Sequence, residues 1–224
     1  MKNILVALVA VVTQAIDIEA NETFVEEAIS SEQNEVNSIE TNGMYGFDIS
    51  TALSLSNAQC MKNLSYDWIA PRAWHSTGTV DTAACTSLKN AKSAGIATRD
   101  VYMFPCPTCS ASAKSQMDSM INYLQANCGS AWSGKIWLDI EGTQYWHTST
   151  TTNRTWYQSL VDACKGRTGI TCGVYASYYQ WESIFGSPSY CYGQNLPLWY
   201  AHFDGHTTFS DYVEFGCWAT PKIK

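Results

Sequence analysis

The sequence lacks long apolar runs, basic patches and paired zinc motifs. Beyond residues 4–12, no stretch approaches the about 18 consecutive apolar residues of a membrane-spanning helix, so membrane insertion is excluded. The 13 Lys and Arg residues form no patch that would attract nucleic acid. The Cys-x-x-Cys at residues 106–109 has no second short-spaced pair, which makes it a poor zinc site. We therefore expect no metal or cofactor, and a monomer.

The N-terminal region differs from the rest of the chain. Residues 1–15 combine Lys2, an apolar run and a short polar end, which is typical of a secretory signal peptide. Residues 16–41 hold eight acids and no Lys or Arg, which indicates an acidic linker or pro-segment, with a short amphipathic helix as the alternative. The 13 basic residues less Lys2, and the 20 acidic residues less these eight, leave 12 of each, so the remaining domain is near neutral.

Residues 42–224 are expected to form one domain that contains all nine cysteines. With a signal peptide, these cysteines predict disulfides, one cysteine staying unpaired, and a secreted protein or one of a vesicular or lysosomal lumen. The Cys-x-x-Cys also resembles a thioredoxin-type redox site. The seven other cysteines and the Pro-Cys-Pro sequence favour a structural disulfide instead.

Strand-like and helix-like segments alternate along this domain. The expected strands are residues 44–49, 68–74, 96–104, 135–141 and 170–176, and the expected helices are residues 57–64, 82–94, 111–125, 152–164 and 178–184. Two more expected strands, residues 196–202 and 213–219, have no helix between them. Five βα units followed by strands alone predict an α/β fold, a modified TIM-like β/α barrel. A doubly wound open sheet is the alternative.

Two carboxylates, Asp139 and Glu141, end the expected strand of residues 135–141. Side chains at i and i+2 of a strand share a face, with Cα atoms roughly 6.5–7 Å apart. Burial and repulsion then favour one neutral and one ionised carboxyl, which glycoside hydrolysis uses. Tyr145 and Trp146 follow, and such aromatic faces stack on sugars. The alternative is a loop in which Asp139 caps the next element and Glu141 faces water.

Other candidate residues fall at or near the carboxyl ends of expected strands, where chemistry collects in both folds. Asp48, at the end of the first strand, joins Asp139 and Glu141 as a catalytic candidate. Asp100 lies in the middle of a strand, and the sequence assigns it no role. The substrate-binding candidates are Asp204, His75, Tyr102, Tyr145, Trp146, Trp199 and His202.

Five short motifs follow one another in the domain. They are residues 45–50 (YGFDIS), 72–78 (RAWHSTG), 100–106 (DVYMFPC), 137–142 (WLDIEG) and 198–203 (LWYAHF). In this order they resemble the secreted lysozymes of glycoside hydrolase family 25, in their cysteine-rich eukaryotic branch. The resemblance implies a β-rich variant of the TIM barrel that cleaves the β-1,4 bond after N-acetylmuramic acid in bacterial peptidoglycan. Such domains usually continue past their final strand, whereas this chain stops at Lys224.

The resemblance also implies roles for the acids. By position, Glu141 is the general acid, Asp139 its partner acid and Asp48 a further inward-facing acid, while Asp204 is a candidate for the family's remaining acid. Asp139 either attacks the anomeric carbon or positions the substrate's acetamido group to do so. Two alternatives in function stay open: a catalytically silent glycan-binding protein, and a chitinase-like hydrolase, whose additional motif acid is replaced here by Trp137.

Overall fold

The computed structural model describes residues 4–6 and 44–224. The strands are β1 (Ile4–Val6), β2 (Met44–Ile49), β3 (Tyr66–His75), β4 (Thr79–Val80), β5 (Thr98–Arg99), β6 (Val101–Met103), β7 (Lys135–Ile140), β8 (Thr171–Ala176) and β9 (Leu198–Tyr200). The helices are α2 (Leu55–Asn63), α3 (Ala83–Ser93), α4 (Ala113–Asn127), α5 (Thr150–Lys165) and α6 (Tyr178–Phe185).

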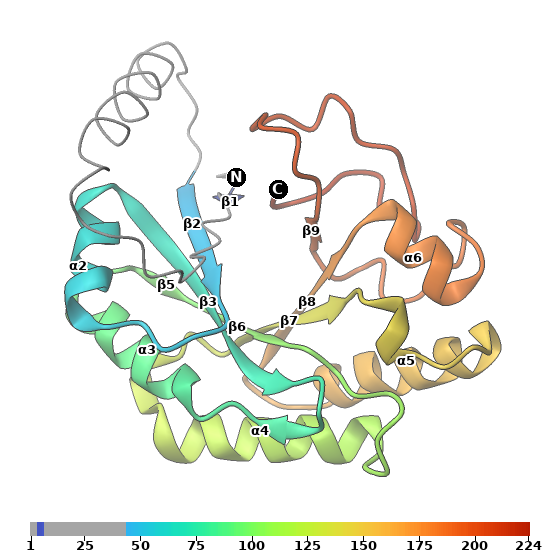
Figure 1. Ribbon diagram of the computed structural model, residues 1–224, viewed down its shortest axis with the longest axis horizontal. Coiled ribbons are helices and arrows are strands. Elements are labelled where there is room, and N and C mark those ends of the chain that lie inside the picture. Colours follow the sequence, from blue (N-terminus) through green and yellow to red (C-terminus); the bar gives the residue numbers. More distant parts are fainter. Residues whose placement is uncertain (1–3, 7–43) are drawn as a thin grey trace, which may run out of the picture.

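The parallel strands curl into a half-barrel, and the helices lie along its outer side (Figure 1). The sheet order is β1-β2-β3-β6-β7-β8-β9, with β4 and β5 paired to β3. A helix follows each of β2, β3, β6, β7 and β8, in the case of β3 after the short β4, and none follows β9 in the described residues. The expected α/β fold, with five βα units before a helix-free end, is confirmed.

Serine side chains explain where four of these helices begin. Each of them accepts a hydrogen bond from a backbone N–H of the first helical turn, which satisfies a donor that has no partner within the helix. These serines are Ser54 before α2, Ser112 before α4, Ser149 before α5 and Ser177 before α6. Asp81 has the same function near α3, because its carboxylate accepts the N–H of Ala83 at 3.1 Å.

The expected strand at residues 213–219 is wrong. Gly216 and Cys217 both have positive φ, +58° and +64°, and the Trp218 N–H donates to the carbonyl of Phe215, so the chain turns there. Phe215 and Trp218 are buried from this turn, which accounts for the apolar pattern that suggested a strand. Besides its pairing with β8, β9 has a parallel bridge from Trp199 to Ile223.

Three tryptophans fill the inside of the half-barrel. Trp68, Trp137 and Trp199 pack edge-to-face, with ring centroids 5.0, 5.7 and 6.4 Å apart. Two glycines make room for them, because a Cβ at Gly46 would lie 2.4 Å from the Trp68 ring and one at Gly173 would lie 2.4 Å from the Trp137 ring. The interior of the half-barrel below the strand ends is therefore filled by these packed tryptophan rings.

Asp100 holds two of these rings in place. Its carboxylate accepts the indole N–H groups of Trp68 at 2.8 Å and Trp137 at 3.0 Å, and its side chain is buried. Asp100 also separates β5 from β6, which divides the single strand expected over residues 96–104. This buried acid, to which no role could be assigned from the sequence, is thus the hydrogen-bond acceptor for two of the packed tryptophans.

Replacing Asp100 by Leu should destabilise the protein by about 2–6 kcal/mol, because two buried indole donors lose their acceptor at about 1–3 kcal/mol each. Asp100→Asn keeps an acceptor oxygen and should change the free energy of unfolding by less than about 1.5 kcal/mol. Urea unfolding of the three proteins measures both effects. Equal stability of Asp100→Leu and wild type would contradict this role.

Four disulfides brace the domain, and they join Cys85 to Cys128, Cys106 to Cys109, Cys164 to Cys172 and Cys191 to Cys217. Cys60 is unpaired and exposed. The expectation of a disulfide framework with one cysteine left over is confirmed.

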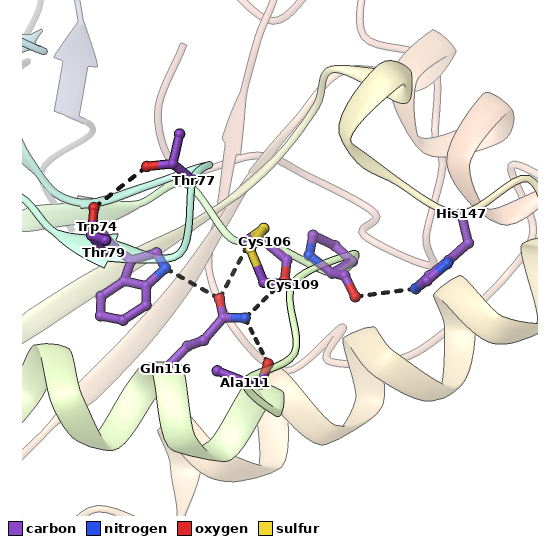
Figure 2. Close-up of a disulfide and its surroundings, with 9 residues drawn as sticks. Trp74, Thr77, Thr79, Cys106, Cys109, Ala111, Gln116 and His147 are labelled. Carbon is purple, nitrogen blue, oxygen red and sulfur yellow. Dashed lines mark hydrogen bonds between the residues drawn. A yellow bond between two sulfur atoms is a disulfide. The ribbon is translucent and has the colours of Figure 1, made fainter.

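The Cys106–Cys109 disulfide lies in a tightly bonded loop between β6 and α4 (Figure 2). The buried Gln116 accepts the Cys106 N–H at 3.1 Å and donates to the Cys106 carbonyl at 2.8 Å. The same amide oxygen accepts the Trp74 indole at 3.1 Å, and His147 contacts the Pro107 carbonyl at 3.1 Å. This network supports the structural interpretation of the Cys-x-x-Cys.

Most of the predicted N-terminal features lie outside the described residues. Of the predicted signal peptide, only Ile4–Val6 is described, as the strand β1 that pairs in parallel with β2. The acidic segment 16–41 lies entirely outside the described residues. Among the helices of the described part, none is both long and apolar enough to cross a bilayer.

Candidate active site

Three carboxyl groups meet in one cavity of about 230 Å³ at the carboxyl ends of the strands. Asp48 comes from the end of β2, Asp139 from the end of β7, and Glu141 from the residue after β7. Parallel strands end at the same edge of a sheet, so residues 91 positions apart in the chain come together. The structure thus brings together the three acids that the sequence selected as catalytic candidates.

Two of these acids have buried oxygens without partners. Among the described residues, the Oδ1 atoms of Asp48 and Asp139 are the buried side-chain polar atoms that have no hydrogen-bond partner. Asp139 is only 5% exposed. A buried acceptor without a donor costs free energy, so both atoms are positioned to accept a hydrogen bond from a ligand in the cavity.

The pKa of each acid in the cavity is raised. Burial, and then the charge of Glu141, raises the pKa of Asp48 to about 6. Burial raises the pKa of Asp139 well above its usual range, and the neighbouring carboxyls of Glu141 and Asp48 raise it further. Burial also raises the pKa of Glu141. The site therefore retains protons at a pH where ordinary carboxyls have lost them.

Arg72 is the positive charge in this cavity, and the sequence did not single it out as a site residue. Its guanidinium donates to the Asp81 carboxylate at 2.9 Å and to the Ser50 carbonyl at 3.1 Å. The charge of Arg72 lowers the pKa of Asp139 and so favours its ionised form. His75, predicted as a substrate-binding residue, contacts the same Asp81 carboxylate at 3.3 Å and does not line this cavity.

Aromatic residues form the remaining walls. The predicted Tyr102 and Trp199 line the cavity, together with Phe104 and Tyr175, which the sequence analysis missed. Tyr175 could have been found from strand register, because it pairs directly with Asp139 across β7 and β8. Burial raises the pKa of both tyrosines, so their hydroxyls stay neutral hydrogen-bond donors.

Trp146 bonds to the backbone of Glu141 and does not line this cavity. Its indole N–H donates to the Glu141 carbonyl at 3.0 Å, and its ring is 6% exposed between Trp156 and Phe185. Trp146, predicted as a substrate-binding residue, is thus buried in the core beside the cavity. The ring of Tyr145 packs edge-to-face on the cavity residue Phe104, with ring centroids 5.2 Å apart, but Tyr145 does not itself line the cavity.

A second, larger groove of about 780 Å³ adjoins the first cavity. It shares the residues Glu141 and Tyr175 with that cavity, and the predicted His202 lines it. The imidazole of His202 contacts the carboxylate of Asp211 at 2.8 Å, and Asp211 lines the groove as well.

Asp204, the candidate for the family's further acid, lines neither cavity. Its carboxylate accepts the Lys224 ammonium at 2.6 Å, and that ammonium also bonds Asp211 at 3.0 Å. His202, Asp204 and Asp211 are the one group in the described residues with spacing for a metal ion. Because Lys224 already supplies the positive charge there, the residues do not favour a metal.

The sequence of this chain is similar to those of known proteins. A family model described as "Lysozyme-like protein 1" matches residues 39–224. "Probable GH family 25 lysozyme 2" of Dictyostelium discoideum is 46% identical over 179 residues, which cover 80% of this chain and 81% of that protein. "Lysozyme-like protein 5" of Caenorhabditis elegans is 38% identical over 180 residues, with 80% and 81% covered.

The fold is also similar to a solved structure. A muramidase from Trichobolus zukalii superimposes with a TM-score of 0.61 over 79% of this chain and 83% of that one, at 23% identity. Identity at this level supports the fold alone.

Proposed function

Because the chain belongs to the eukaryotic lysozyme-like proteins of glycoside hydrolase family 25, we propose that it is a secreted lysozyme. Its substrate is bacterial peptidoglycan, and it hydrolyses the β-1,4 bond between N-acetylmuramic acid and N-acetylglucosamine. The observation that carries the proposal is the single cavity that holds Asp48, Asp139 and Glu141. The four disulfides agree with a secretory route.

In this mechanism Glu141 is the general acid. Its raised pKa keeps a proton on the carboxyl, and the side chain faces the two adjoining cavities. A glycosidic oxygen placed between them receives that proton as the bond to the anomeric carbon breaks. The bond from Trp146 to the backbone carbonyl of Glu141 holds this residue in position.

Asp139 acts in its ionised form on the other side of the bond. Its unpartnered Oδ1 is suited to accept the N–H of the substrate's acetamido group, whose carbonyl oxygen then attacks the anomeric carbon. The sequence suggested that Asp139 stays ionised beside a neutral Glu141. Burial raises the pKa of Asp139, however, and so disfavours this ionised form. The charge of Arg72, and the positive charge that develops on the acetamido nitrogen, offset that cost.

Asp48 completes the set of acceptors. Its Oδ1 is also buried without a partner, and it lies in the same cavity as Asp139. With a pKa of about 6, Asp48 changes its protonation at a pH well above that of an ordinary carboxyl. It orients the acetamido group or the water that later releases the product.

Analysis of the new reducing ends tests the proposed reaction. The oxidised, folded protein is incubated with purified peptidoglycan, the products are reduced with borohydride, and the fragments are identified by mass spectrometry. We expect muramicitol ends, because cleavage follows N-acetylmuramic acid. Glucosaminitol ends would contradict the proposal and favour the chitinase-like alternative, whereas binding without any fragments would favour a silent glycan-binding protein.

A further inference from the structure

Three Asn-x-Ser/Thr sequences, the acceptor motif of N-linked glycosylation, begin at Asn21, Asn63 and Asn153. Asn21 lies outside the described residues. The transferase modifies the chain before it folds, so a glycan is compatible with the folded protein only where the Asn side chain lies at the surface with a free amide group. The structure separates the other two sites by this criterion.

Asn153, near the start of α5, is closed to a glycan. It is 1% exposed, and its Nδ2 donates to the carbonyls of His147 and Ile184, both at 2.9 Å. Its Oδ1 accepts the His147 N–H at 3.0 Å. Because a glycan replaces one hydrogen of Nδ2 by a sugar carbon, it would break one of these buried bonds and need space in a packed interior.

Asn63, the last residue of α2, is open. Asn63, Leu64 and Ser65 are all exposed, Leu64 at 63%. Within the described residues, the side-chain amide of Asn63 has no hydrogen-bond partner. The chain turns at Ser65, which has a φ of +67°, so the motif lies at the corner between α2 and β3.

We propose that Asn63 carries an N-linked glycan and that Asn153 stays unmodified. In this reaction the Nδ2 of Asn63 forms a bond to the anomeric carbon of an N-acetylglucosamine, and it loses one proton to a base of the transferase. The bond from that carbon to a polyisoprenyl diphosphate breaks, and the diphosphate leaves with the electron pair. The inference rests on the proposed secretory route and not on the proposed reaction.

The glycan site lies away from the acids. Helix α2 ends at Asn63 before the amino end of β3, whereas the three acids lie at the carboxyl ends of the strands, and α2 is on the outer side of the sheet (Figure 1). Asn63 lines neither of the two cavities. A glycan on Asn63 therefore leaves the acids accessible.

The same glycan would cover the unpaired cysteine. Cys60 lies three positions before Asn63 on α2, and both residues are exposed. Residues at this spacing share a helix face, with Cβ atoms about 5–6 Å apart, and helical side chains tilt toward the N-terminus. A sugar on Asn63 thus extends over the turn that holds Cys60 and shields its thiol from disulfide formation between molecules.

Site mapping tests the proposal. The full chain is secreted from a eukaryotic host and treated with peptide N-glycosidase in heavy-oxygen water, which converts a glycosylated Asn into a labelled Asp that mass spectrometry locates. We expect a label at position 63 and none at position 153. Asn63→Gln and Ser65→Ala should each lose the mass of one glycan. Thr155→Ala, the matched control in the other motif, should lose none. An unlabelled position 63, or a labelled position 153 in folded protein, would overturn the proposal.

Further outcomes separate this inference from the proposed function. If no protein reaches the medium, the proposed secretory route fails, and the full chain behind a signal sequence of the host tests position 63 by the same mapping. A labelled protein that does not clear peptidoglycan would overturn the proposed reaction and support the glycan site. A polyethylene glycol maleimide should label Cys60 faster in Asn63→Gln than in wild type, and equal rates would overturn the shielding.

Discussion

Replacing Glu141 by Gln should lower kcat/KM on peptidoglycan by about 10²–10⁴-fold, because an amide cannot donate the proton that the leaving oxygen needs. The substitution is nearly isosteric, and the backbone carbonyl of Glu141 still accepts the Trp146 indole. We therefore expect an unchanged fold. Turbidity clearing of purified peptidoglycan by wild type and variant measures the loss, with near-ultraviolet circular dichroism to verify the fold.

A leaving group that needs no proton isolates this role of Glu141. On a glycoside with a 2,4-dinitrophenol leaving group, Glu141→Gln should retain most of the wild-type rate. The pH profile gives a second check. Because Glu141 must be protonated, wild-type activity should fall as the pH rises through its raised pKa, and the residual activity of the variant should lack this fall. Clearing by Glu141→Gln at nearly the wild-type rate would remove Glu141 from the mechanism.

Asp139→Asn should lower kcat/KM by about 10²–10³-fold, because a buried negative charge no longer stabilises the positive charge that develops on the acetamido group. Unlike the loss in Glu141→Gln, this loss should be similar for peptidoglycan and for the dinitrophenyl glycoside. Asp139 acts on the sugar under attack, and the nature of the leaving group does not change that role. Initial rates on both substrates make the comparison.

Asp100→Asn is the matched control for this variant. It makes the same chemical change at another buried aspartate, which accepts hydrogen bonds from Trp68 and Trp137 and does not line the catalytic cavity. We expect it to retain activity. Loss of activity in Asp100→Asn but not in Asp139→Asn would contradict the assignment. The anomer of the first product, followed by NMR, tests the route itself, because net inversion would exclude attack by the acetamido group.

The sequence predicted the parts of the site that depend on parallel strands. Asp139 and Glu141 follow from an apolar strand that ends in two acids, and Asp48 from another such strand end. Once the strands are parallel, these ends must meet at one edge. The regular alternation of strand and helix therefore predicted a parallel α/β sheet with these acids at one edge, and the resemblance to family 25 lysozymes implied the barrel variant and the roles of the acids.

Residues whose role depends on contacts distant in the sequence were not predictable in this way. The position of Asp204 after an expected strand is typical of a site acid. The structure adds that its carboxylate accepts a hydrogen bond from Lys224, at the end of the chain, at 2.6 Å. Trp146 lies shortly after the motif of residues 137–142, yet its side chain packs in the core. In the sequence, Arg72 is one residue of an expected strand and of a short motif. Only the structure shows that it lines the cavity and that its charge lowers the pKa of Asp139.

The placement of the disulfides has a consequence for how this protein would lose activity. Cys85–Cys128 and Cys164–Cys172 restrain the elements on both sides of β7, the strand that presents Asp139 and leads to Glu141. No disulfide in the described residues reaches β2 or α2, so β2, which carries Asp48, is held by noncovalent pairing with β1 and β3. Proteins open locally where such restraints are weakest. Heat would therefore separate Asp48 from the other two acids by fraying at β2, at a temperature where the cross-linked remainder still holds its structure.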